Sequence, residues 1–180
     1  HDLSRYFTLV HEDLDKWKMG MAYLYTTRGI PMVYYGTEIL MTGEESEGHG
    51  YIREDFPGGW PGDTVNAFVS EGRTPDQEEA FQYLKMLINW RKTKEVIHSG
   101  DLMHFLPDDG LYVYFRYDDE DAVMVVMNNH ETGPREADLI DYEEITGQYS
   151  VMKDIMTGEE KPLEGVLTIG AKSVLIFDLE

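Results

Sequence analysis

The spacing of apolar residues changes near residue 96, and this change constrains the fold more than any other feature of the chain. Before about residue 93 two long segments have apolar residues at helical spacing, whereas beyond residue 96 the apolar residues alternate and turn signals such as Asp109-Gly110 recur between the runs. Candidate strands cover residues 101–105, 111–117, 122–127, 148–155, 166–169 and 173–179. Short strands at this spacing predict an antiparallel β-sandwich.

Two helices are expected in the first half. Apolar residues from Leu14 to Tyr25 lie on one helical face, which predicts a helix over about 13–28. Thr74, Pro75 and Gln77 form a capping box with proline at the first helical position, which predicts a second helix reaching about residue 93. Residues 41–63 between them are rich in Gly, Glu and Pro, and a loop of this length is usually functional or mobile.

The segment 28–39, which reads RGIPMVYYGTEI, predicts one strand between the helices. Residues 32–35 form a continuous apolar run, as expected of a parallel strand that is covered on both faces. Pro31 is tolerated at the start of a strand, and Gly36 allows the chain to turn away at its end.

Three segments, in order, resemble the α-amylase superfamily of glycoside hydrolases (family 13). In that superfamily the catalytic domain is a barrel of eight strands. RGIPMVYYGTEI resembles the region of the eighth barrel strand, and HDLSR at residues 1–5 resembles the motif N-H-D-x-x-R that follows the seventh barrel strand. DFPGGWPGD at residues 55–63 is similar to a loop of the neopullulanase, cyclomaltodextrinase and starch-utilisation amylase branch. The resemblance implies an α/β plus all-β fold: residues 1–95 as the C-terminal end of a TIM (β/α)8 barrel, and residues 96–180 as an antiparallel Greek-key β-sandwich domain.

The resemblance also implies an activity. Members are retaining α-glucan hydrolases or transglycosylases that act on α-1,4 and in some cases α-1,6 bonds, with an Asp nucleophile, a Glu acid/base and a second Asp that stabilises the transition state. Only the third carboxylate, Asp2, falls within this chain, so the isolated chain is expected to be inactive. The alternative is a noncatalytic glucan-binding or transport-associated relative of the same fold.

Four residues are candidates for substrate binding. His1 is the usual sugar-contacting partner of the motif, and Arg5 either positions carboxylates or forms a structural ion pair. Arg53 and Trp60 lie on the loop that includes DFPGGWPGD, which either lines the cleft or forms a rigid turn under the barrel rim. Glu38 is expected to be structural.

Composition narrows the partners. With 35 acidic and 15 basic residues the net charge is −20, which excludes nucleic acid and anionic membrane surfaces as partners and leaves neutral α-glucan oligosaccharides. The chain has no cysteine, and Glu44, Glu45, Glu47 and His49 lack the pattern of a calcium loop, so no metal or cofactor is expected in these residues. If the enzyme binds calcium, we expect the site to lie in a part of the protein outside these residues. The sequence does not distinguish between the bacterial periplasm and the cytoplasm as the compartment.

One strand and two helices of a barrel leave apolar surfaces without partners. We therefore expect the first 93 residues to pack against a second copy, forming a homo-oligomer, or against an upstream part of the polypeptide, or to be partly disordered. No apolar run approaches the length that spans a bilayer.

Overall fold

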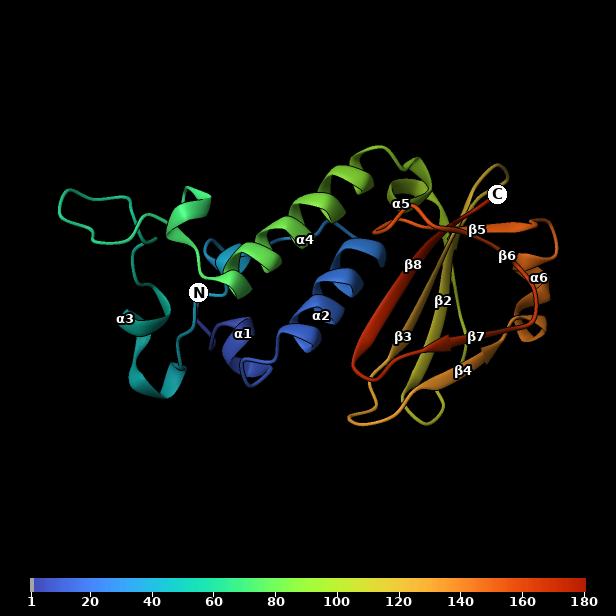
Figure 1. The fold of residues 1–180 in the computed structure, drawn as a ribbon, viewed down its shortest axis with the longest axis horizontal. Coiled ribbons are helices and arrows are strands. Elements are labelled where there is room, and N and C mark those ends of the chain that lie inside the picture. The colour runs from blue at the N-terminus through green and yellow to red at the C-terminus, as the bar shows by residue number, and fades with distance from the viewer. Residues whose placement is uncertain (1) are drawn as a thin grey trace. The chain divides into compact units, whose positions relative to one another are not determined.

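The computed structural model describes residues 2–180, which form two compact units (Figure 1). The first unit comprises residues 2–18 and 31–85, and the second comprises residues 19–30 and 86–180. Helices α2 (Leu14–Thr26) and α4 (Pro75–Lys92) contribute residues to both. The domain boundary predicted between residues 95 and 96 stays a prediction.

The first unit consists of short helices and turns around a small core. Besides the beginnings of α2 and α4, its elements are α1 (Tyr6–Leu9), η1 (Thr37–Ile39), η2 (Glu45–Glu47), α3 (His49–Ile52) and η3 (Ser70–Gly72). Trp17, Ile39 and Ile52 are fully buried, and the rings of Trp17 and Tyr83 meet edge to face with centroids 6.3 Å apart.

Both predicted helix starts are confirmed. Asp13 Oδ1 accepts hydrogen bonds from the backbone N–H groups of Asp15 (3.0 Å) and Lys16 (3.1 Å) at the start of α2. At the start of α4 the Thr74 N–H donates to Gln77 Oε1 (2.9 Å) and the Gln77 N–H donates to Thr74 Oγ1 (3.3 Å). This reciprocal pair is the predicted capping box.

The strand predicted at residues 32–35 is wrong for this chain. Residues 30–34 have no regular secondary structure and pair with no strand among the residues that the structure describes, and Ile30 and Met32 are 97% and 89% exposed. A parallel strand is stabilised by backbone hydrogen bonds to neighbouring strands. No parallel neighbour is present among residues 2–180, so the apolar run remains an open segment.

The second unit contains two antiparallel sheets, which confirms the predicted antiparallel architecture. One has the order β1-β2-β3-β8-β5-β6 and the other pairs β4 with β7. The strands are β1 (Asp101–His104), β2 (Leu111–Tyr117), β3 (Ala122–Asn128), β4 (Arg135–Asp138), β5 (Val151–Asp154), β6 (Glu160–Pro162), β7 (Val166–Ile169) and β8 (Ser173–Leu179).

Strands β4 and β6 were not predicted because they lack an apolar alternation. Only Ala137 of β4 is buried, and all three residues of β6 are exposed. The strand predicted over 148–155 is shorter, because helix α6 (Glu143–Thr146) and a turn precede β5. The remaining helical elements of this unit are α5 (Glu95–Ser99) and η4 (Leu139–Tyr142).

The hydrophobic core lies between the two sheets. Val113, Phe115, Met124 and Phe177 of the larger sheet pack in one cluster with Ile169 of β7. All seven residues of β3 are buried, because its other face is covered as well. Helix α5 contacts β2 and β3 on that outer side.

Arg116 of β2 joins the outer side of the sheet to the helices of the same unit. Its guanidinium is 1% exposed and donates to four backbone carbonyls, those of Thr26 (3.3 Å), Ile97 (2.8 Å), Gly100 (2.6 Å) and Asp101 (3.1 Å). A buried arginine is tolerated here because its hydrogen bonds are satisfied by carbonyl oxygens.

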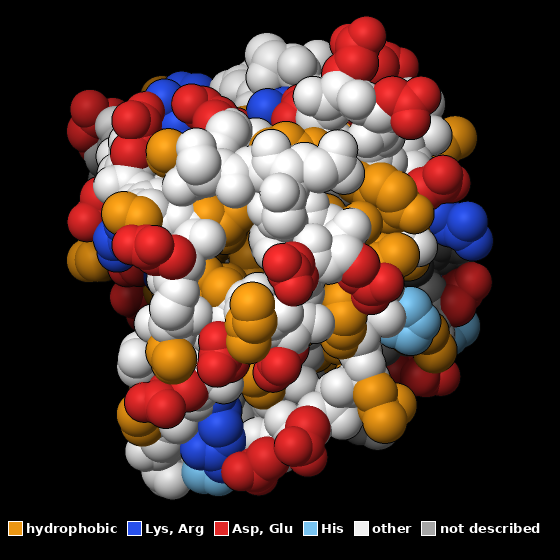
Figure 2. Space-filling model, turned by 90° about the vertical axis from the view of Figure 1, so that its right-hand side faces the viewer, with side chains coloured by type: hydrophobic (Ala, Val, Ile, Leu, Met, Phe, Trp, Pro, Cys, Tyr) orange, Lys and Arg blue, Asp and Glu red, His pale blue; other side chains and the backbone are white. Residues whose placement is uncertain are grey.

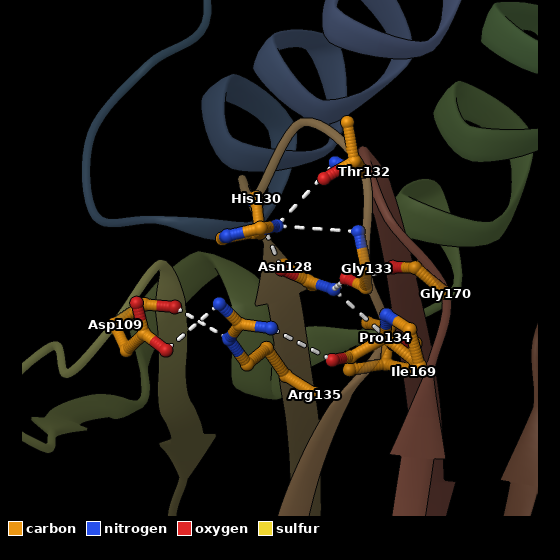
Figure 3. Close-up of polar contacts among 9 residues, drawn as sticks. All are labelled: Asp109, Asn128, His130, Thr132, Gly133, Pro134, Arg135, Ile169 and Gly170. Carbon is orange, nitrogen blue, oxygen red and sulfur yellow. Dashed lines mark hydrogen bonds and ion pairs between the residues drawn. The ribbon is translucent and has the colours of Figure 1, made fainter.

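A polar cluster ties three loops together at one end of the sandwich (Figure 3). The buried Asn128 amide donates to the carbonyls of Gly133, Ile169 and Gly170, while His130 Nδ1 accepts from the N–H groups of Thr132 and Gly133. Arg135 forms an ion pair with Asp109 (2.7 Å) and also donates to its carbonyl (2.8 Å). The turn between β1 and β2 is thereby fixed to the start of β4.

Candidate functional site

The carboxylate of Asp2 is paired with Arg53 in the first unit. Arg53 Nη2 lies 2.7 Å from Asp2 Oδ1 and 3.2 Å from His49 Nδ1. The Asp2 and Arg53 side chains are 64% and 41% exposed. The structure therefore brings two of the predicted site residues together, with an oriented carboxylate that faces solvent. His1, also predicted to bind substrate, lies outside the described residues.

The loop at 41–45 holds the segment that follows Asp2. The Ser4 hydroxyl donates to Glu44 Oε1 (2.8 Å) and accepts from the Glu45 N–H (2.9 Å), while the Arg5 N–H donates to the Gly43 carbonyl (2.9 Å). These bonds join segments 40 residues apart. Asp2 is thus held by its ion pair with Arg53 and by the anchoring of Ser4 and Arg5, which follow it in the chain.

Arg5 is not part of the exposed pair. It is 5% exposed, donates through Nη1 to the Tyr35 carbonyl (2.7 Å), and lies 5.0 Å from the ring centroids of both Tyr34 and Tyr35. Its Nε and Nη2 atoms have no hydrogen-bond partner among residues 2–180, so the aromatic faces are the groups that surround its charge. Its role in substrate binding stays a prediction.

The DFPGGWPGD segment is a turn with its own internal bonds. Asp63 Oδ2 accepts from the N–H groups of Gly58 (2.8 Å) and Trp60 (3.0 Å). Gly58 has a φ of 102°, and a side chain there would come within 2.6 Å of the Asn66 Cα, so glycine is required. Trp60 is 63% exposed on this turn. A rigid turn and an exposed aromatic side chain therefore coexist.

A pocket of about 380 Å³ lies beside the anchored segment. Its lining includes the carboxylates of Glu12, Glu44, Glu47 and Glu54 and the side chain of Tyr51. Carboxylate oxygens accept hydrogen bonds from hydroxyl groups, so this lining suits a polyhydroxylated ligand. Within residues 2–180, no three His, Cys, Asp or Glu side chains are grouped so as to hold a metal ion.

Sequence reasoning did not identify the residues that hold the site. Glu44 contacts Ser4 and His49 contacts Arg53, yet both were interpreted only as members of a solvated acidic loop. The ring pair Tyr34 and Tyr35 was assigned to a buried strand, although it packs on Arg5. The adjacent tyrosines three residues after Pro31 give no signal for this contact, because it depends on how the loop folds back.

Comparison with known families finds one match, which lies in the sandwich. Residues 102–178 match the family described as the cyclo-malto-dextrinase C-terminal domain. The chain is 25% identical over 135 residues to a cyclomaltodextrinase of a Bacillus species, covering 74% of this chain and 21% of the relative. It is 31% identical over 119 residues to a cyclomaltodextrin glucanotransferase of Klebsiella oxytoca, covering 63% of this chain and 16% of the relative. The chain thus spans about a fifth or less of the length of these relatives.

The fold agrees with a solved structure. The α-amylase from Geobacillus thermoleovorans, solved as a complex with acarbose, superposes with a TM-score of 0.74 at 20% identity over 100% of this chain and 37% of that one. Such a likeness shows a common fold over the whole length of this chain. No helix among the described residues is long and apolar enough to cross a membrane.

Proposed function

We propose that this chain is part of a retaining α-glucan hydrolase of the α-amylase superfamily, because residues 102–178 match the family described as the cyclo-malto-dextrinase C-terminal domain and the chain is similar to a cyclomaltodextrinase. The proposed substrates are α-1,4-linked glucan oligosaccharides, with α-1,6 bonds as a second linkage. The observation that carries this proposal is the match of residues 102–178 to that domain. The nucleophile and the acid/base are assigned to residues other than those of this chain.

In this proposal residues 2–95 are the end of the catalytic barrel. The unpaired segment at 30–34 supports it, since its exposed Ile30 and Met32 are what a barrel strand would present after its neighbours are removed. The superposition on an α-amylase over the whole chain supports it as well. Greek-key connectivity of the sandwich and association into a homo-oligomer belong to the same proposal.

Asp2 is the proposed transition-state stabiliser. Positive charge develops at the anomeric carbon as the glycosidic bond breaks, so a fixed carboxylate interacts more strongly with the transition state than with the bound sugar. Arg53, 2.7 Å away, orients this carboxylate. His1 and Trp60 are the proposed contacts to the substrate's hydroxyls and to a pyranose face.

The test of this role is an Asp2→Asn variant of the complete enzyme that contains this chain. We expect kcat on maltoheptaose to fall at least about a hundredfold, as when one electrostatic transition-state contact is lost, while KM changes much less. Asp15→Asn, an exposed carboxylate on the first turn of α2, is the matched control and should keep full activity. Near wild-type kcat in Asp2→Asn would overturn the assignment.

A complementary test uses the purified 180-residue chain. It should hydrolyse no maltooligosaccharide, because a stabilising carboxylate without nucleophile and acid/base completes neither half of a double displacement. Turnover that follows the chain through purification would contradict the proposed division of the active site. Absence of turnover in the complete enzyme on α-glucans would instead favour a noncatalytic glucan-binding relative.

A further inference from the structure

Arg53, which holds the carboxylate of Asp2, has a second acceptor in the imidazole of His49. Arg53 Nη2 donates to Asp2 Oδ1 (2.7 Å) and lies 3.2 Å from His49 Nδ1. Because a guanidinium has no acceptor atom, Nδ1 must accept, and the neutral imidazole then carries its proton on Nε2. Nη2 bears two hydrogens, one for each acceptor. The two bonds together restrict the guanidinium more than the ion pair alone would.

His49 and Arg53 are exposed, but the short helix that carries them is fixed. His49 is the first residue of α3 and Arg53 is its C-cap, so the two side chains lie on the same side of the helix. Ile52 of the same helix is fully buried. Gly43 packs directly on the helix, because a Cβ on Gly43 would come within 2.6 Å of the Tyr51 carbonyl oxygen. Buried contacts thus set the positions from which the two exposed side chains extend.

The loop at 41–45 supports both α3 and the segment that follows Asp2. The carbonyl of Gly43 accepts from the Arg5 N–H (2.9 Å), while the absence of a side chain on Gly43 leaves room for α3. The backbones that carry Asp2 and Arg53 therefore share one support. What remains to be fixed is the orientation of the two side chains.

The excess of acidic residues makes that orientation a matter of selection. The chain has 35 acidic and 15 basic residues, and Figure 2 shows acidic side chains far more prominent than basic ones on one face of the molecule. Arg53 itself is followed directly by Glu54 and Asp55. A long, flexible arginine side chain among several carboxylates is not committed to one of them by charge alone. A neutral acceptor at a fixed position favours one orientation without adding a competing charge.

We propose that His49 is a positioning residue for catalysis, which keeps Arg53 directed at Asp2 and thereby holds the Asp2 carboxylate where it stabilises the transition state. This role rests on the proposed function of Asp2. A carboxylate at position 49 would compete with Asp2 for the guanidinium, whereas the neutral imidazole adds a hydrogen bond and leaves the charge of Arg53 to Asp2. Since a displacement of about 1 Å at a catalytic group lowers turnover strongly, loss of this bond should be measurable in kcat.

Two substitutions of similar shape separate the hydrogen bond from the rest of the side chain. In the complete enzyme that contains this chain, His49→Leu removes the acceptor, whereas the amide oxygen of His49→Asn can occupy the position of Nδ1. We expect kcat on maltoheptaose to fall about tenfold in His49→Leu, with KM changed less than about twofold, and to stay within about twofold of wild type in His49→Asn. His98→Leu, at an exposed histidine of α5, is the control and should keep full activity.

The same substitution without the carboxylate tests whether His49 acts through Asp2. In an Asp2→Asn background, His49→Leu should lower kcat no further, because the group that it positions is already lost. A second tenfold loss in the double variant, as about expected for an independent effect, would show that His49 affects turnover by another route and would contradict the proposal.

Nuclear magnetic resonance on the 15N-labelled 180-residue chain tests the structural step without catalysis. The order parameter of the Arg53 side-chain Nε–H should fall in His49→Leu and stay near the wild-type value in His49→Asn, while that of the exposed Arg28 is the same in all three proteins. An unchanged order parameter in His49→Leu, or wild-type kcat in this variant beside a large loss in Asp2→Asn, would overturn the role of His49 and leave the proposed function standing. Full activity of Asp2→Asn would overturn both.

Discussion

At the scale of single residues, Arg116 is the side chain on which the second unit depends most. The carbonyls that accept its hydrogen bonds belong to α2, α5, Gly100 and β1. Removing the guanidinium would therefore leave several buried carbonyl oxygens without a donor. We expect Arg116→Lys to lower the free energy of unfolding by at least about 2 kcal/mol, because each buried polar group left unpaired costs roughly 1–3 kcal/mol. Urea denaturation measures this, with the exposed Arg28→Lys as control. An equal decrease in the free energy of unfolding in the two variants would mean that the Arg116 guanidinium is not required.

Asp178 makes the stability of the same unit depend on pH. Burial raises its pKa, although Lys94 (3.2 Å) and the Trp90 indole (3.3 Å) favour the carboxylate. A carboxyl whose pKa is higher in the folded than in the unfolded state stabilises the fold most below its ordinary value of about 3.9, and this contribution is lost as pH rises through the folded value.

The prediction therefore concerns the difference in the free energy of unfolding between the wild-type chain and the Asp178→Asn variant. The stability of the wild-type chain relative to Asp178→Asn should decrease as pH rises from about 4 toward neutrality, since only the wild type titrates at this position. Urea midpoints at several pH values give this difference, and Asp119→Asn in the exposed turn between β2 and β3 should show no such trend. A relative stability that increases with pH would show that the ion pair with Lys94 outweighs burial.

At the scale of secondary-structure elements, the start of α4 is held by two hydrogen bonds that should act as one. Thr74→Ala should destabilise the chain by about 1 kcal/mol, the usual value of a helix N-cap. Gln77→Ala removes the reciprocal bond, and the double variant should cost less than the sum of the two single changes because the pair is cooperative. Strict additivity in thermal unfolding would argue against a coupled cap.

Elements were predictable from the sequence where a local signal decided the structure. Strands β2, β7 and β8 begin and end at the predicted residues, because turn signals in the sequence bound their apolar runs. The strand expected at 32–35 failed because its pairing requires strands that these residues do not supply. Asp2 and Arg53, 51 positions apart, were each singled out, but their ion pair depends on the folding of the intervening loop and could not be predicted.

At the scale of the whole molecule, the sandwich alone is not the complete second unit. Residues 19–30 and 86–95 belong to it, and the Thr26 hydroxyl bonds the buried Tyr114 hydroxyl of β2. We expect a chain cut to residues 96–180 to fold less stably than the same residues in the full chain, because the outer face of β2 and β3 would be exposed. Hydrogen exchange of β3 amides compares the two, and equal protection would show that the helices contribute nothing.

The polar cluster around Asn128 also determines where the chain should tolerate an insertion. Because one amide serves the carbonyls of Gly133, Ile169 and Gly170, a length change in either of those loops removes bonds from the other, and the two can be rebuilt only together. The turn at Gly158, where an added side chain would meet no other atom within 4 Å at its Cβ, has no such dependence. Inserted peptides or fused reporter domains should be accepted between β5 and β6 and rejected at the Asn128 end, so tolerance to insertion differs between turns of similar exposure.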